Sequence, residues 1–380
     1  MRRVKLGQIC EVVSGGTPKT NVEEYWNGEF NWITPAEIND NDYIISDTKR
    51  KITQLAIEKK KLPLLPKGTV LLSSRAPIGK VAITGKEMYC NQGFKNLICS
   101  DEICNEYLYW YLKSKKEYLN SLGRGATFKE ISKKIVENIE IKLPEIERQR
   151  KIVDKLKKVD KIIQRRKNQS RLLDVVVQAR FVEMFGDPII NNMSWPESTI
   201  GDGCFVTKLA GFEYSKYIEY DDTGDVVMVK AQNVKNGTLN RKDLSFISNE
   251  VSDALPRSQL LPGDVVMTYV GANIGDVALI DDKYKYHLAP NVAKIRVDAK
   301  IYNSVYFMYM LMFLNSYIVK NSADTAKAAL GMERIRKLKV FIPTYDLQNQ
   351  FAAFVQQVNK SKFEIQKSLE KTQLLFDSLM

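Results

Sequence analysis

Side chains that could act as nucleophiles or hold a metal ion are scarce in this sequence. The only histidine is His287, which stands in the segment KYHLAP, and the five cysteines form no CxxC pair. A zinc site, or a nucleophile activated by histidine, needs at least two such side chains close together. We therefore expect no metal site and no catalytic residue, and we expect His287 to be a packed or surface residue. The odd number of cysteines predicts buried thiols in a reduced, cytoplasmic protein: Cys10, Cys90, Cys99, Cys104 and Cys204.

Motifs that bind nucleotides are also missing. The segment APIGK ends in Gly79-Lys80 like a phosphate-binding loop, but Ser74 stands where such a loop needs its first glycine. No GxGxxG segment follows an expected strand, and the Asn/Asp-Pro-Pro-aromatic motif of adenine and cytosine amino-methyltransferases does not occur. We therefore expect the chain to bind no cofactor.

Positive charge is what the sequence has in excess. Its 57 lysines and arginines exceed its 45 acidic residues, which gives a net charge of +12 and a pI near 9.2. A surplus of this size favours polyanionic partners, nucleic acid first and acidic membrane surfaces second. The segment MRRVKLGQIC lacks the apolar centre of a signal peptide, and the apolar run VYFMYMLMFL from Val305 is too short to cross a bilayer. We expect this run to be a core helix and the protein to have no membrane partner.

The segments that would position such side chains occur twice. LLPKGTVLLSSRAPIGKVAI, from Leu64, and LLPGDVVMTYVGANIGDVAL, from Leu260, share nine of twenty residues when aligned without a gap. Further pairs of segments match in the same order at offsets that rise from 194 to 199 residues, and they begin at Val4 and Ser198, Trp32 and Met228, Glu106 and Val305, and Val136 and Ile335. A collinear offset of this kind indicates a tandem duplication of a whole domain.

Each copy predicts the same order of elements. About 100 residues of short β-rich segments, broken by Gly, Pro and Asn, precede a helix expected over 101–122 and 303–322. A last strand then ends at Leu143-Pro144 or Ile342-Pro343, and a polar stretch without glycine predicts a long helix over 145–183 and 346–379. The fold class is therefore α+β, and the chain divides into a first domain (1–143), a central helix (144–186), a second domain (187–342) and a C-terminal helix (343–380).

Both long stretches carry apolar residues every three or four positions. This seam is typical of helices that pack lengthwise as in a coiled coil, and the alternative is two amphipathic helices on separate cores. Between Glu145 and Arg171 the first stretch has eleven basic and four acidic residues, which favours a phosphate backbone or an acidic partner. The apolar positions are Ile152, Leu156, Val159, Ile163, Leu173, Val177 and Met184, then Leu347, Phe351, Phe354, Val358, Ile365, Leu375 and Leu379.

In these features the sequence resembles the specificity (S) subunits of type I restriction-modification systems. The resemblance rests on LPEIERQRKI at Leu143 and IPTYDLQNQF at Ile342, each opening a long helix, on SGGTPKT at Ser14 and on the repeated hairpin. It covers essentially the whole chain. It implies that each domain is a target-recognition domain reading one half of a bipartite, asymmetric site in double-stranded DNA. It also implies that the two helices pair as an antiparallel coiled coil, which sets the spacing between the halves.

The resemblance implies partners as well. The helices would dock two copies of a methyltransferase (M) subunit, which carry S-adenosylmethionine and flip an adenine. A restriction (R) subunit, where the system has one, would use ATP and Mg to translocate and cut DNA. The chain itself would have no turnover. The segment ERQRK in the first helix corresponds to DLQNQF in the second, which lacks its basic residues, so the two docking surfaces would be unequal.

Contacts to DNA are expected from loops on one basic face, with Arg and Lys on phosphates and Asn, Gln and Arg on base edges. The candidates in the first domain are Lys19, Thr20, Thr34, Glu37, Arg75, Lys80, Gln92 and Lys95. Those in the second domain are Lys208, Tyr214, Lys230, Gln232, Asn233, Lys235, Tyr269, Asn273 and Asn291.

Differences within the repeated hairpin mark where the two domains would read different DNA. The ungapped alignment sets Arg75 against Gly271 and Pro77 against Asn273. Residues that both copies keep are instead assigned to folding: Gly79, Ala82, Gly275 and Ala278. The stretch GRGATFKE from Gly123 and its counterpart ADTAKAAL from Ala323 could meet a phosphate, but a plain loop is the favoured interpretation.

Two other functions fit the same sequence. A duplicated protein-interaction scaffold would have no affinity for DNA and would dock an acidic protein on its basic helix. A self-sufficient DNA methyltransferase or nuclease with degenerate motifs would bind S-adenosylmethionine, or cleave DNA with Mg, without any partner.

Overall fold

The computed structural model describes residues 2–125, 129–322 and 329–379. The chain separates into two compact units, Met1–Lys167 with Lys367–Met380 (unit 1) and Asn168–Gln366 (unit 2). The long helices α6 (Ile146–Phe185) and α12 (Tyr345–Ser378) each contribute to both units. The four-part division drawn from the sequence follows chain order rather than compactness, and it stays a prediction.

Unit 1 combines short strands with helices that follow them in the chain. Its described strands are β1 (Arg2–Lys5), β2 (Cys10–Ser14), β3 (Trp26–Ile33), β4 (Ile44–Ile45), β5 (Arg50–Ile52), β6 (Val70–Leu72), β7 (Val81–Thr84), β8 (Tyr89–Cys90), β9 (Lys95–Cys99) and β10 (Glu140–Leu143). Its helices besides α6 and α12 are α1 (Leu6–Ile9), η1 (Glu23–Tyr25), η2 (Pro35–Glu37), α2 (Gln54–Lys60), α3 (Asn105–Ser114), α4 (Lys116–Ser121) and α5 (Lys133–Glu137). The strands pair as β1-β10, β2-β9-β6-β7-β4 and β5-β3-β8.

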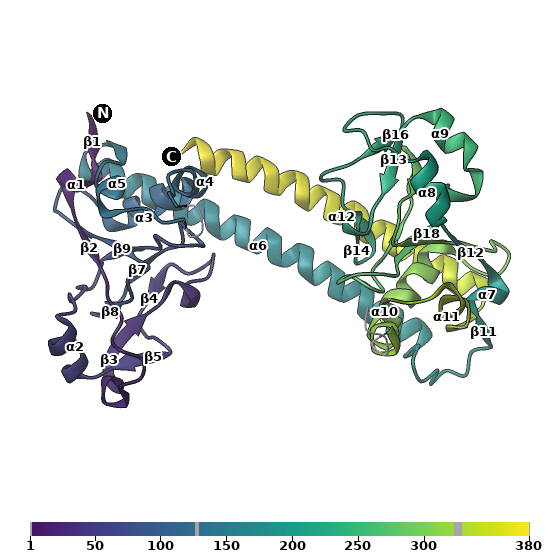
Figure 1. Cartoon of the computed structure of the whole chain (residues 1–380), viewed down its shortest axis with the longest axis horizontal. Helices are drawn as coiled ribbons and strands as arrows, with labels where there is room; N and C mark the ends of the chain where they lie inside the picture. Colours follow the sequence, from purple (N-terminus) through teal and green to yellow (C-terminus); the bar gives the residue numbers. More distant parts are fainter. Residues whose placement is uncertain (1, 126–128, 323–328, 380) are drawn as a thin grey trace. The chain divides into compact units, whose positions relative to one another are not determined.

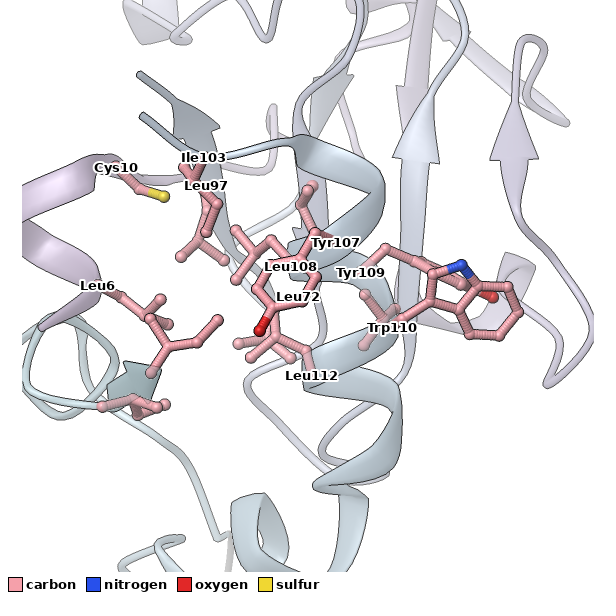
Figure 2. Close-up of a cluster of buried hydrophobic side chains, with 14 of the residues drawn as sticks. Leu6, Cys10, Leu72, Leu97, Ile103, Tyr107, Leu108, Tyr109, Trp110 and Leu112 are labelled. Atoms are coloured by element: carbon pink, nitrogen blue, oxygen red, sulfur yellow. The ribbon is translucent and has the colours of Figure 1, made fainter. Parts of the chain in front are cut away.

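The five-stranded sheet lies in the middle of unit 1, with both faces covered. Helices α1, α3 and α5 lie on one side of it, and β3, β5, β8 and α2 lie on the other (Figure 1). Side chains alternate between the faces of a strand, so Val70 and Leu72 join the core under α3 while Leu71 joins the core shared with Ile33. Figure 2 shows Leu72 and Leu97 of the sheet among the side chains of α3.

Unit 2 has elements of the same kinds. Its described strands are β11 (Glu197–Thr199), β12 (Cys204–Lys208), β13 (Val226–Val229), β14 (Val234–Lys235), β15 (Thr238–Leu239), β16 (Phe246–Ile247), β17 (Gln259–Leu260), β18 (Val265–Thr268), β19 (Val277–Leu279), β20 (Lys285–Leu288), β21 (Val292–Val297) and β22 (Lys339–Phe341). Its helices besides α6 and α12 are α7 (Ile200–Gly203), α8 (Gly211–Tyr217), η3 (Ala231–Asn233), α9 (Asn249–Ala254), η4 (Pro256–Ser258), α10 (Ser304–Ser322) and α11 (Met332–Arg336).

Strand pairing confirms the duplication. The sheet β12-β21-β18-β19 of unit 2 repeats the order β2-β9-β6-β7 of unit 1, and the pair β11-β22 repeats β1-β10. The parallel pairs β3-β8 and β13-β20 also correspond. An α+β fold with two copies of one β-rich domain is therefore what the chain adopts.

The hairpin repeat is offset by one residue from the ungapped alignment. Leu71 pairs with Ala82 in unit 1, whereas Val266 pairs with Ala278 in unit 2. The second copy thus has one residue fewer before its first strand and one more in its loop. The backbones of Arg75 and Glu130 form an isolated β-bridge. In unit 2 the corresponding β-bridge joins Val270 to Ala329. The alignment of Arg75 with Gly271 was therefore wrong. The two copies of the hairpin have the same total length, so an ungapped alignment does not reveal the residue lost before the first strand and the residue gained in the loop.

The residues that both copies of the hairpin share have the folding role expected of them. Gly79 and Gly275 both adopt positive φ, at 88° and 84°, where a side chain would strain the backbone. Ala82 and Ala278 are both fully buried in the core opposite the helices.

The long helices pack side by side inside each unit and also cover its core. In unit 2, Asp174 of α6 pairs with Lys362 of α12, and Phe181 of α6 contacts Phe351, so the two segments run antiparallel. In unit 1, α6 residues share a core with Phe376 of α12, and that core includes Val153, Leu156, Val159 and Ile163. Within each unit the helices therefore pack against each other, and the core of each unit contains side chains of both helices rather than of one alone.

Some helix boundaries and seam positions were predicted wrongly. The helix expected over 101–122 is two helices, α3 and α4, which meet at Lys115. The seam placed Leu375 inward, but its side chain is 52% exposed and Phe376 is the buried residue. A fixed step of three or four residues drifts against the helix over many turns, which accounts for this error.

The remaining expectations concern burial. His287 is fully buried in β20, as a packed residue should be. Cys10 and Cys90 are buried, whereas Cys99, Cys104 and Cys204 are only partly buried. The apolar run from Val305 forms the core helix α10, whose inward side chains include Phe307, Met310 and Leu311. Within the ranges that the structure describes, no helix is long and apolar enough to cross a membrane.

Candidate nucleic-acid interface

The strands of unit 1 bring several loops to one edge, which we call the loop edge of unit 1. The antiparallel pairing of β2 with β9 sets the end of β2 beside the start of β9, and β6 and β7 form a hairpin. The parallel strands β3 and β8 end side by side. The loop edge therefore comprises the residues that follow β2, β3 and β8 and those that join β6 to β7, namely 15–20, 34–37, 91–94 and 73–80.

Hydrogen bonds tie these loops together. Gly16 N donates to Cys90 O at 2.9 Å, and Ser74 N donates to Gly93 O at 2.7 Å. The ammonium of Lys80 donates to the carbonyl of Pro35 at 3.0 Å. The loop edge of unit 1 is thus an ordered surface built from segments far apart in the chain.

The candidates of the first domain lie in these loops, except Lys95, which is the first residue of β9, and they are not equally accessible. Lys19, Thr20, Arg75 and Gln92 are exposed, and Lys80 is half-buried. Glu37 accepts hydrogen bonds from the N–H and hydroxyl of Thr34 and from the N–H of Lys49, so these side chains cap η2. Lys95 is buried.

A charged cluster links the hairpin loop to a distant segment. The Nε of Arg75 donates to one oxygen of Glu130 at 3.0 Å, and the ammonium of Lys95 donates to the other at 3.1 Å. Burial alone would raise the pKa of Glu130, but the hydrogen bonds and charges of Lys95 and Arg75 outweigh it and hold this pKa below its usual value. We call these three residues the Arg75–Glu130–Lys95 cluster.

Unit 2 has an equivalent loop edge that carries different side chains. Hydrogen bonds identify the matching positions, because Tyr269 N donates to Asn291 O at 3.0 Å as Ser74 N does to Gly93 O. Tyr269 thus replaces Ser74, and Asn291 replaces Gly93. The loop edge of unit 2 comprises the residues after β12, β13 and β20 and those between β18 and β19, namely 209–217, 230–235, 289–291 and 269–276.

The second domain's candidates fall into two groups at this edge. The ammonium of Lys208 lies 5.4 Å from the ring centre of Tyr269, which is next to Asn291. The ammonium of Lys230 lies 4.5 Å from the ring centre of Tyr220, which packs against Tyr214. The remaining candidates belong to other segments of this edge: Gln232 in η3, Asn233 in η3, Lys235 in β14 and Asn273 in the hairpin loop.

Asn233 is the candidate most engaged in holding the fold. It is 2% exposed, and its amide accepts from the N–H of Lys230 and donates to the carbonyls of Asn240 and Lys242. It corresponds to Glu37, which caps η2 in unit 1 in the same way.

Glu130 was missed among the sequence candidates. It is the last residue of GRGATFKE, a stretch interpreted as a plain loop, and it lies 55 residues from Arg75 in the chain. No periodicity or motif marks such a long-range pair. Residues 126–128 of this stretch, and 323–328 of its counterpart ADTAKAAL, lie outside the described residues.

The fold thus contains two copies of one domain, and each copy has a loop edge that includes lysine or arginine side chains. A family model of the type I restriction modification DNA specificity domain matches residues 1–170 and again residues 192–374. The chain therefore belongs to this family and contains its domain twice, which confirms the resemblance to specificity subunits.

Known relatives span nearly the whole chain. The chain is 29% identical to the type I restriction enzyme MjaIX specificity subunit of Methanocaldococcus jannaschii, over 99% of this chain and 90% of that protein. It is 23% identical to the MjaVIII specificity subunit of the same organism, over 97% of this chain and 90% of that protein.

Solved structures show the same fold at lower identity. The S subunit of a type I restriction-modification system from M. genitalium superposes with a TM-score of 0.54 at 15% identity, covering 100% of this chain and 94% of that chain. A chain from a study of complex assembly and conformational transition in the type I R-M system gives a TM-score of 0.61 at 17% identity, covering 100% of this chain and 96% of that chain.

Proposed function

We propose that this chain is the DNA-recognition subunit of a type I restriction-modification complex and that each domain reads one half of a bipartite, asymmetric DNA site. The observation that carries the proposal is the pair of loop edges, which share one framework but differ in the side chains they present. Ser74 and Gly93 at the first edge correspond to Tyr269 and Asn291 at the second. Identical edges would suit a symmetric target, whereas different edges on one framework suit two different half-sites.

The long helices supply the second part of the proposal. They would set the distance between the half-sites and dock two methyltransferase subunits. Apolar side chains on the unit 2 part of the helices support a protein partner, because Val175 and Val176 of α6 and Phe363 of α12 are 48%, 46% and 66% exposed. The basic first part of α6 has no match in the nearly balanced α12, so the two docking surfaces differ.

In this proposal the chain recognises DNA and performs no turnover. S-adenosylmethionine belongs to the methyltransferase subunits, and ATP and Mg belong to a restriction subunit where the system has one. The exposed and half-buried candidates at the two loop edges would supply the contacts, with Lys19, Lys80 and Lys208 on phosphates and Arg75, Gln92 and Asn291 on base edges.

Binding as a function of salt tests the proposal. The chain, purified with its methyltransferase partner, is titrated with duplex DNA that contains the sequence methylated in the source cells. We expect the logarithm of the binding constant to fall linearly with the logarithm of salt concentration, because phosphate contacts release counterions. We also expect a scrambled duplex to bind at least about a thousandfold more weakly.

The other two functions predict different results in this titration. A protein-interaction scaffold would bind neither duplex, with or without the methyltransferase. A self-sufficient enzyme would methylate or cleave DNA as the purified chain alone, with S-adenosylmethionine or Mg. Either result would overturn the proposal.

A further inference from the structure

The Arg75–Glu130–Lys95 cluster combines a buried part with an accessible part. The Lys95 side chain is 9% exposed, the Glu130 side chain 33% and the Arg75 side chain 47%. Each oxygen of the Glu130 carboxylate accepts a hydrogen bond from a different cation. The cluster therefore starts at a buried ammonium and ends at a guanidinium on the surface of the loop edge.

Backbone hydrogen bonds hold the segment of Glu130 against the segment of Arg75. Glu130 N donates to Arg124 O at 2.9 Å and Arg124 N to Glu130 O at 3.0 Å, and Ile131 N donates to Ser74 O at 2.9 Å. Arg75 and Glu130 thus stand on neighbouring extended segments. The carboxylate reaches Arg75 from a held position, so the guanidinium loses little further freedom when it binds a target.

Within the described part of the chain, the guanidinium of Arg75 makes its hydrogen bond through its inner nitrogen. Its Nε donates to Glu130, and among residues 2–125, 129–322 and 329–379 neither Nη1 nor Nη2 donates a hydrogen bond to another group. The two outer nitrogens form the fork that binds two acceptors at once. A guanine presents such a pair, O6 and N7, in the major groove.

Unit 2 lacks the whole cluster. At the β-bridge where unit 1 has Arg75 opposite Glu130, unit 2 has Val270 opposite Ala329. Lys95 pairs with the last residue of β2, and Ala293 pairs with the last residue of β12. All three charged positions are therefore apolar in the second copy, although the strands pair in the same order and Leu330 N donates to Tyr269 O as Ile131 N donates to Ser74 O. The second copy folds without the cluster, so the fold does not require these charges. We therefore assign the cluster to DNA recognition by the first domain.

We propose that Glu130 is a specificity-positioning residue that aims the outer nitrogens of Arg75 at a guanine in the half-site read by the first domain. The inference rests on the proposed function and deepens it. Lys95 neutralises the inner side of the carboxylate and keeps Glu130 in place. The second domain, with Val270, Ala293 and Ala329, has no such contact and reads its half-site by other side chains.

The test maps methylated sequences by single-molecule sequencing in cells that carry the chain with its methyltransferase. The variants are Glu130→Gln, Arg75→Gln and Arg75→Lys, and the matched control is Glu117→Gln, which changes an exposed carboxylate on α4. We expect Glu130→Gln and Arg75→Lys each to relax the preference for guanine about tenfold at one position of one half-site. The other half-site and the control stay unchanged.

A variant that leaves Lys95 unpaired could fail to fold, so the double variant Lys95→Met with Glu130→Gln is measured alongside. It resembles the apolar second copy, and we expect it to fold and to relax the same position. Thermal unfolding of each purified complex checks that the protein is intact.

Three results would overturn the inference. One is a first half-site with no position restricted to a G·C pair. Another is Arg75→Gln lowering methylation at all sites alike with base preference unchanged, which identifies a phosphate contact. The third is Glu130→Gln matching Glu117→Gln. The proposed function fails separately, if the unmodified chain gives no bipartite methylated sequence at all.

Discussion

Gln149 and Gln348 make the same three hydrogen bonds at the start of the two long helices. The side-chain oxygen of Gln149 accepts from Cys104 N at 2.8 Å, and its amide donates to Glu102 O and Pro144 O, both at 2.9 Å. Gln348 accepts from Asn303 N at 2.8 Å and donates to Ile301 O and Pro343 O at 3.0 and 2.9 Å. Both side chains are fully buried. Each glutamine fixes its long helix to the loop that precedes the core helix of its own unit.

Replacing either glutamine should destabilise its unit. Gln149→Leu removes the partner of one N–H and two carbonyls, of which only the Pro144 carbonyl lies in a fully buried contact, and this should lower the free energy of unfolding by about 2–4 kcal/mol. Gln348→Leu should cost unit 2 a similar amount. Urea denaturation followed by circular dichroism measures both. Gln178→Leu, at an exposed position of α6, is the control and should change the free energy by less than about 0.5 kcal/mol. Equal effects of Gln149→Leu and the control would contradict the assigned role.

Neighbouring residues at the end of α12 should differ sharply in their contribution to unit 1. Phe376 is 7% exposed and lies edge-on to Trp110, with ring centres 5.5 Å apart, whereas Leu375 is 52% exposed. Phe376→Ala should lower the free energy of unfolding by about 3 kcal/mol because it leaves a cavity. Leu375→Ala should cost less than about 0.5 kcal/mol. The same denaturation experiment measures both variants. A larger loss for Leu375→Ala than for Phe376→Ala would support the seam predicted from the sequence, in which Leu375 points inward.

His287 should make unit 2 sensitive to acid. Burial lowers the pKa of His287 below its usual 6.5, although the carbonyls of Leu288 and Leu255 favour the protonated ring. The unfolded chain therefore binds a proton that the folded chain resists. The stability that depends on the neutral ring is present above pH 6.5 and is lost as the pH falls through the lowered folded-state pKa.

Calorimetry of wild type and His287→Leu between pH 7.5 and pH 5 measures this effect. The melting temperature of the wild type should fall more steeply than that of the variant. His287 is the only histidine in the chain, so no other side chain of this type contributes in that range. Parallel curves for the two proteins would show that the buried ring does not titrate there.

The framework of this fold could be predicted because its signals lie in short segments of sequence and occur in both copies. Pro144 and Pro343 each end a strand before a long helix, and the two copies check one another. The apolar run from Val305, too short to cross a bilayer, identified α10 as a core helix. Both errors arose where a fixed spacing was assumed. At Leu375 a fixed step drifted along the helix, and in the hairpin an ungapped alignment hid two changes of length.

The candidate site was harder to predict, since its side chains meet only in the folded chain. The topology places Lys19, Arg75 and Gln92 at one edge, and their loop positions made them candidates. The contact of Glu130 with Arg75 depends on a bridge between segments 55 residues apart. Burial of Lys95 follows from its place at the start of a central strand, beside Ser14.

The central claim is that each domain reads one half of a bipartite DNA site, and a domain exchange tests it most directly. Residues 1–143 are replaced by the matching domain of a relative with a different target, and the methylated sequences of cells carrying the chimera and the methyltransferase are determined. The account predicts that one half of the site changes to that of the relative while the other half and the spacing stay the same. A chimera that folds and methylates, but changes both halves or neither, would contradict it.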